Sequence, residues 1–208
     1  TVLAQYNNCR IDFVTIFREP IQRYVSQYNQ WFLKTKESMS FEDYLRLDYA
    51  CNFQTKKIVG SEDFAKAKTV LQEKFRAVGS VEHFDAFLVL FQKAAAKKSF
   101  DPKYRPVNVS KKRARMDQLI RRYEGQIIEN NRVDIELYNY VTHVLEPRQC
   151  AQYGSRFHTD LRKIKALNRH PPALDNWAMR FDYYMRLAFE KGTGACRRLG
   201  GLPASGSY

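Results

Sequence analysis

The sequence predicts an α/β protein in which helices flank a parallel sheet, and two observations favour this class. A run rich in β-branched and aromatic residues at 11–17 leads directly into a helical pattern that starts at Pro20. A second unit of the same kind follows, with a short apolar run at 76–81 and a helix at 84–95. Strands that alternate with helices are typical of parallel sheets. From residue 116 onward the pattern is mainly helical, so we expect a helix-rich C-terminal half.

The best-defined helix is predicted from Pro20 to about Lys34. Proline suits the first helical position, because its missing N–H would be unpaired there and its φ is already helical. One side of the helical wheel is apolar and consists of Ile21, Tyr24, Val25, Tyr28, Trp31 and Phe32. The preceding strand is expected to be buried on both faces, and Arg18 is then at its carboxyl end, where open α/β sheets bind ligands.

Shorter helices are expected between the two strand–helix units. Ser40 is a candidate N-cap, and Asp43 follows three residues later as in a capping box. A further helix is expected to begin near Asn52 and to stop at Gly60. Residues 61–73 are predicted to form the helix that leads into the second strand.

Charge and cysteine spacing limit the class of partner. The chain of 208 residues has 35 Lys and Arg against 22 Asp and Glu, a net charge of +13. This balance implies a polyanion, and nucleic acid, an anionic membrane, a phosphorylated nucleotide and an acidic polysaccharide all satisfy it. No apolar run is long enough to span a bilayer. The four cysteines form no C-x-x-C pair, which argues against a zinc or redox centre, whereas disulfides and free thiols both stay open.

Arg18 and Ser26 are the strongest candidates for a binding site. An arginine at a strand end offers a planar fork of donors that suits phosphate. Ser26, on the polar face of the following helix, can add a hydroxyl donor. The alternative is that Arg18 pairs with a nearby carboxylate and that Ser26 faces water.

The string around these residues is REPxxRxxSxY at 18–28. It resembles the 3′-phosphate-binding motif of sulfotransferases that use 3′-phosphoadenosine-5′-phosphosulfate (PAPS), their glycan-modifying branch in particular. The family usually has Asp where this chain has Glu19, so the charge is kept. The resemblance implies a P-loop-like parallel sheet, a 3′-phosphate held by Arg18 and Ser26, and no metal.

A second resemblance covers the string NFQTKKIVG at 52–60. It is similar to an Asn-x-Gln-Thr-x-x-x-x-Gly segment near the acceptor cleft of the same branch. It implies that Asn52, Gln54 and Lys57 contact the acceptor. An Asn and a Gln two residues apart do not share a helix face, so helix capping and contact with solvent are the alternative.

A basic loop follows the proline-containing segment 99–110. The window 111–115 holds four cations and is either a solvated charge run or a phosphate-binding loop. Similar loops in the family close over the nucleotide, which implies that Ser110 and Lys111 contact PAPS.

The catalytic residues stay unassigned. Glu82 and His83 follow the second strand and could form a catalytic pair, but a capping or packing role is the alternative that the resemblance favours. The family's phosphosulfate loop and catalytic base precede the first strand and have no counterpart in residues 1–11. We therefore expect the C-terminal two-thirds of a sulfotransferase domain, truncated on its N-terminal side.

The resemblance predicts transfer of a sulfuryl group from PAPS to a hydroxyl of a carbohydrate, glycosaminoglycan-like acceptor. Residues 1–146 would form the partial sulfotransferase domain and 147–208 a basic extension. The expected compartment is the Golgi lumen, with a membrane anchor upstream, or the cytoplasm if the source is bacterial. The alternatives are a degenerate sulfotransferase that serves as a scaffold, and a non-catalytic basic module that binds an acidic glycan or nucleic acid.

Overall fold

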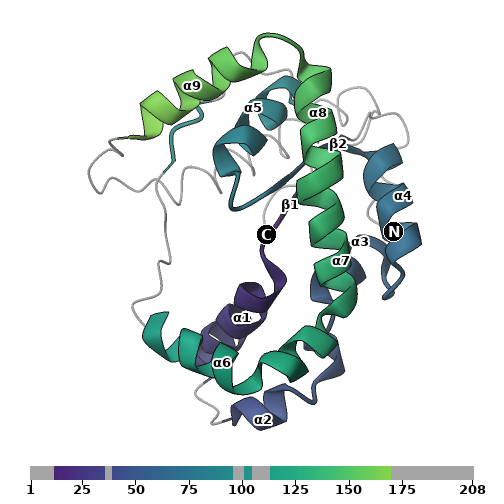
Figure 1. Cartoon of the computed structure of the whole chain (residues 1–208), viewed down its shortest axis with the longest axis vertical. Helices are drawn as coiled ribbons and strands as arrows, with labels where there is room; N and C mark the ends of the chain where they lie inside the picture. The colour runs from purple at the N-terminus through teal and green to yellow at the C-terminus, as the bar shows by residue number, and fades with distance from the viewer. Residues whose placement is uncertain (1–11, 36–38, 96–100, 105–112, 170–208) are drawn as a thin grey trace, which may run out of the picture.

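The structure is a computed structural model that describes residues 12–35, 39–95, 101–104 and 113–169 (Figure 1). Two parallel strands, β1 (Phe13–Phe17) and β2 (Phe75–Ser80), form its sheet. The helical elements are α1 (Pro20–Thr35), α2 (Phe41–Tyr44), η2 (Asp48–Ala50), α3 (Phe53–Val59), α4 (Phe64–Lys74), α5 (Phe84–Ala94), α6 (Arg113–Asn130), α7 (Arg132–Tyr140), η3 (Val141–Leu145), α8 (Glu146–Tyr153) and α9 (Phe157–Asn168). The fold is therefore α/β and rich in helix, as predicted.

Local signals placed the early helices correctly. Helix α1 begins at Pro20, and its buried residues include Tyr24 and Tyr28. Ser40 caps α2, since its Oγ accepts a hydrogen bond from the Asp43 N–H at 3.0 Å. Gly60 ends α3 with a left-handed φ of 75°, a conformation that glycine adopts without strain. The residue types at these positions were therefore sufficient to predict the helix boundaries.

The two strands end together at one edge of the sheet. Their register pairs Phe17 with Ser80, so the residues that follow each strand lie side by side. The main chain continues this pairing, because Val81 N–H donates to the Phe17 carbonyl at 2.7 Å. Arg18 therefore lies at the carboxyl edge of a parallel sheet, as expected.

Helices cover both faces of β2. Ala77 packs into a cluster with α5 and α9, whereas its neighbour Val78 packs on the opposite face with α4, α7 and η3. A Cβ on Gly79 would lie 2.8 Å from the Cβ of Phe87, so the close approach of α5 requires glycine there. A parallel strand between two helical layers is the arrangement that the apolar run at 76–81 predicted.

The expectation that β1 is buried on both faces was wrong for the part of the chain that the structure describes. Among its five side chains only Phe17 is buried, and Phe13 is 39% exposed. Helices α4 and α5 and the turn η3 pack on β2, and β2 is the neighbour of β1 among the described residues. The apolar run predicted the strand correctly, but it did not indicate how many layers of helices cover the strand.

The helical half is divided into more elements than the helical pattern predicted from residue 116 onward indicates. Helix α6 bends at Tyr123, whose φ of −121° and ψ of 21° are not helical. Helix α7 passes through the π-helical turn η3 into α8, and Figure 1 shows them as one column. Residue 146, where we expected the first domain to end, thus begins α8, and α8 and α9 pack against α5. The division of the chain at this point stays a prediction.

Candidate functional site

The two residues predicted to share a phosphate lie together at the carboxyl edge of the sheet. The Arg18 Nη1 group donates to Ser26 Oγ at 3.2 Å. Arg18 comes from the turn after β1 and Ser26 from the second turn of α1, and both side chains are partly buried. In this contact the partner of the Arg18 guanidinium is therefore the Ser26 hydroxyl and not a carboxylate.

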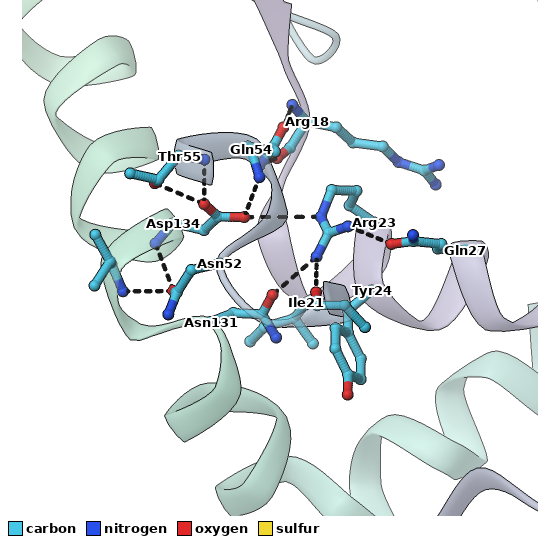
Figure 2. Close-up of polar contacts among 12 residues, drawn as sticks. Arg18, Ile21, Arg23, Tyr24, Gln27, Asn52, Gln54, Thr55, Asn131 and Asp134 are labelled. Atoms are coloured by element: carbon cyan, nitrogen blue, oxygen red, sulfur yellow. Dashed lines mark hydrogen bonds and ion pairs between the residues drawn. The ribbon is translucent and has the colours of Figure 1, made fainter. Parts of the chain in front are cut away.

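Gln54 fixes the main chain of Arg18. Its Oε1 accepts from the Arg18 N–H at 2.9 Å, and its Nε2 donates to the Arg18 carbonyl at 3.0 Å. This two-point contact resembles the pairing of a neighbouring strand, although a side chain of α3 supplies it. In Figure 2, Gln54 lies at the Arg18 main chain while the arginine side chain extends away from it. Gln54 thus positions Arg18 without using its guanidinium.

Glu19 occupies the N-terminus of α1 with its own carboxylate. The two carboxylate oxygens accept from Ile21 N–H at 3.0 Å and from Gln22 N–H at 2.8 Å. These bonds satisfy helix donors that would otherwise be free to bind an anion. An external phosphate at this edge would consequently depend on Arg18 and Ser26 rather than on the helix N-terminus.

A buried polar junction lies beside Arg18 and joins α1, α3 and α7. We define it by Arg23, Asn52, Thr55, Asn131 and Asp134 (Figure 2). Asp134 is 1% exposed, and its carboxylate accepts from Gln54 N–H at 2.9 Å and from Thr55 N–H and Oγ at 2.7 Å each. Asp134, a residue of α7, therefore caps the N-terminus of α3.

Asn52, at the start of α3, in turn caps α7. Its Oδ1 accepts from Val133 N–H at 2.9 Å and from Asp134 N–H at 3.1 Å, so it caps the N-terminus of α7. Its Nδ2 donates to Glu62 Oε2 at 2.8 Å. The backbone of Asn52 has a left-handed φ of 44°, which asparagine tolerates better than most residues. Two helices thus cap each other through side chains.

Arg23 completes the junction from α1. Its guanidinium donates to Gln27 Oε1 at 2.5 Å, to the Ala50 carbonyl at 3.2 Å and to Asn131 Oδ1 at 2.9 Å. Its Nε lies 3.9 Å from Asp134 Oδ2 without a hydrogen bond. Burial lowers the pKa of Arg23, and the Asp134 carboxylate opposes that effect. Arg23 is therefore an internal structural cation.

The three residues predicted to contact the carbohydrate acceptor make different contacts in the structure. Asn52 and Gln54 make the internal bonds given above, so a contact with an acceptor stays a prediction for both. Lys57 is exposed, and its Nζ lies 5.2 Å from the centre of the Phe53 ring. Ser110 and Lys111, predicted to contact the nucleotide, lie outside the described residues.

A second polar group follows β2 at the same edge. Glu146 is buried, and its carboxylate accepts from Ser80 Oγ at 3.1 Å and lies 3.2 Å from His83 Nδ1. Burial raises the pKa of Glu146, although His83 and Ser80 act against this. The His83 side chain is 58% exposed. Sequence spacing could not reveal this group, because Glu146 comes from α8.

Glu82 ties the two strand ends together. Its Oε1 accepts from Glu19 N–H at 3.1 Å, and its Oε2 accepts from Tyr138 OH at 2.9 Å. Glu82 and His83 therefore use different partners, and the catalytic pair that the sequence offered as one interpretation stays a prediction. A catalytic role for His83 stays untested.

Other candidate chemistry is limited in the described part of the chain. Cys51 and Cys150, the two described cysteines, are free thiols. Across residues 12–169, apart from the gaps given above, no three His, Cys, Asp or Glu side chains gather as metal ligands would. No helix in those ranges combines the length and apolar character needed to cross a membrane.

Comparisons with known proteins add no family to this picture. No family model, no curated protein and no solved structure matches the chain. The carboxyl edge of the sheet therefore supplies the geometric evidence for function.

Proposed function

We propose that this chain is the nucleotide-binding part of a PAPS-dependent sulfotransferase with a P-loop-like fold. The observation that carries the proposal is the contact between Arg18 and Ser26 at the end of β1, at 3.2 Å. The two residues occupy the positions that bind the 3′-phosphate in the motif that 18–28 resembles. Gln54, from the second resembling string, holds the Arg18 main chain. Two segments that resemble the same family thus meet at one point.

The chemistry of this pair suits a phosphate dianion. An arginine fork gives two parallel N–H donors, a serine hydroxyl adds a third, and each hydrogen bond to an ionised oxygen is stronger than a neutral one. Ser110 and Lys111 would add contacts from the basic loop. In the complete enzyme the acceptor oxygen would attack sulfur, the bond from sulfur to the 5′-phosphate would break, and a base would take the hydroxyl proton.

The acceptor we propose is an acidic carbohydrate. The net charge of +13 favours a polyanionic chain, and Asn52, Gln54 and Lys57 belong to the string that lies near the acceptor cleft in the resembling family. Such an enzyme would act in the Golgi lumen with an upstream anchor in a eukaryote, or in the cytoplasm of a bacterium.

Nucleotide specificity tests the proposal. We expect 3′-phosphoadenosine 5′-phosphate (PAP) at a hundred times its Kd to stabilise the fold by about 2.7 kcal/mol, and AMP to do so far less. Arg18→Ala should remove the difference between the two nucleotides, because only PAP has the 3′-phosphate. Arg121→Ala, which removes an exposed cation of α6, is the matched control and should keep it.

The readout is the melting temperature of the protein with each nucleotide. Equal shifts with PAP and AMP, or no shift with either, would reject the 3′-phosphate site. PAP binding without sulfate transfer by the full-length parent would instead indicate a degenerate sulfotransferase that serves as a scaffold.

A further inference from the structure

The outer face of α9 has a row of cations. Arg162, Lys165 and Arg169 follow one another at steps of three and four residues, which places them on one side of a helix. All three are exposed, and we call them the α9 stripe. The row extends over about 10 Å of helix length at 1.5 Å per residue. It is a linear arrangement of charge rather than a pocket.

The opposite side of α9 is already packed. Phe157 and Ile164 are buried in the cluster that α9 shares with α5, and Figure 1 shows the two helices side by side. Asp160, the acidic residue of α9, lies away from the stripe, where it accepts from Tyr153 OH at 2.9 Å and from Lys163 Nζ at 3.0 Å. The stripe therefore has no carboxylate of its own helix beside it.

The stripe cations differ from several other described cations, which have internal partners. Lys56 pairs with Glu62 at 2.8 Å, and Arg76 pairs with Asp12 at 2.9 Å. The side chains of Arg162, Lys165 and Arg169 make no ion pair, hydrogen bond or ring contact with any residue that the structure describes. Lys165 and Arg169 lie at the C-terminus of α9, whose partial negative charge attracts cations. Arg162 lies outside the last turn, so this attraction does not explain its position.

We propose that the α9 stripe binds an acidic polysaccharide, a chain that carries sulfate or carboxylate groups at regular intervals. A linear polyanion laid along the helix would meet several cations in turn, and none of them would have to break an internal ion pair first. The choice of a carbohydrate rests on the proposed function, whose acceptor is a glycan. The stripe would hold a part of the chain away from the Arg18 site.

Two other polyanions fit the stripe less well. A helix that binds a membrane surface inserts its apolar face, and the apolar face of α9 is packed against α5. Single-stranded nucleic acid depends on aromatic side chains for base stacking, and the stripe contains no Phe, Tyr or Trp. A polysaccharide requires neither feature.

The experiment measures binding of a heparin octasaccharide by titration calorimetry at low salt. We expect Arg162→Gln/Lys165→Gln to weaken binding about tenfold, because each neutralised cation removes one contact to the chain. The control Arg121→Gln/Arg132→Gln removes the same charge from two exposed, unpaired cations on separate helices and should change affinity less than about twofold. The exchange variant Arg162→Lys/Lys165→Arg keeps the charges and should bind like the parent.

Three results would overturn the proposal. Equal weakening by the stripe and control variants would mean that net charge, not the stripe, attracts the glycan. No weakening by the stripe variant would remove α9 from the interaction. Equal loss of affinity for a single-stranded DNA oligonucleotide of the same charge would assign the stripe to polyanions in general. The PAP-dependent shift in melting temperature should be unchanged in the stripe variant, so failure here and failure of the Arg18 site are separate results.

Discussion

Arg18 and Arg23 are five residues apart in sequence and have opposite roles in the structure. Arg23 donates to internal acceptors on α1, on η2 and at the N-cap of α7, and it belongs to the polar junction. Arg18 has its main chain fixed by Gln54, while its guanidinium contacts one serine hydroxyl. Two arginines close in sequence thus differ in the number of their internal partners, and the proposed binding role falls to Arg18, the one with fewer.

The same criterion applies across the molecule. At the polar junction every charge faces a partner, so its removal should cost folding free energy. At Arg18 and on the α9 stripe the cations have few internal partners or none, so their removal should cost binding and leave folding nearly unchanged.

Asp134→Ala should give the largest effect on stability. It removes the cap of α3 and leaves Arg23 as a buried cation without its carboxylate, which typically costs about 3–5 kcal/mol. Urea unfolding measures the change. Asp134→Asn keeps one acceptor oxygen for the α3 amides and should lose less.

Asp160→Ala is the matched control for that variant. Asp160 pairs with Lys163 at 3.0 Å on the surface of α9, where such a pair contributes about 0–1 kcal/mol. Similar losses for the two alanine variants would contradict the view that the junction, rather than any ion pair, stabilises the fold.

Gln54→Leu should separate positioning from folding. Loss of the two bonds to the Arg18 main chain should cost about 1–2 kcal/mol of stability, because the Arg18 N–H and carbonyl lose a partner that leucine cannot replace. Affinity for PAP should fall about tenfold as Arg18 loses its fixed orientation.

Calorimetric titration with PAP is the measurement, and AMP affinity is the internal reference. A purely structural role would lower both affinities together through partial unfolding. Lys57→Leu, on the same helix but exposed, should leave PAP binding as it is.

Glu146→Gln should give the smallest effect, and its sign depends on pH. The ordinary pKa of the Glu146 carboxyl is near 4.5, and burial raises it in the folded protein. Below that ordinary value the group is protonated in both states and contributes nothing. As pH rises, the unfolded chain ionises first, so the parent protein loses stability until the pH passes the raised value.

Glutamine does not titrate, so the variant should gain stability relative to the parent as the pH rises above the ordinary pKa of the glutamate carboxyl. Urea midpoints at one pH below that value and at several above it measure this. The polar groups near the carboxylate include Ser80, His83, Glu82, Tyr138 and Cys150, and Ser80 can still donate to glutamine. A variant that loses stability over that pH range would show that the pairing with His83 outweighs burial.

Local sequence signals predicted the parts of the fold that depend on neighbours in the chain. Pro20, Ser40 and Gly60 each marked a helix boundary, because capping and φ preferences act over a few residues. The contact between Arg18 and Ser26 is of the same kind, since both lie within one strand–turn–helix unit.

Long-range partners were not predictable in this way. Asp134 and Glu146 read as ordinary helix residues, and nothing nearby in sequence indicates that one caps α3 and the other lies against Ser80 and His83. The sequence offered Gln54 as a contact to the acceptor, with helix capping and contact with solvent as the alternative. In the structure its amide holds the Arg18 main chain, 36 residues away. Such contacts depend on how helices pack, which periodicity does not encode.

The mutual caps of Asn52 and Asp134 have a consequence for the order of folding. Helix α3 has seven residues, well below the roughly 12–15 at which an isolated helix persists, and its cap comes from 80 residues later in the chain. Its first turn is therefore complete only when α7 has docked. Gln54 lies in that turn, so the anchor for Arg18 arises in the same late step. A chain that has not yet synthesised α7 would therefore lack the cap of α3 and the ordered anchor of the Arg18 main chain.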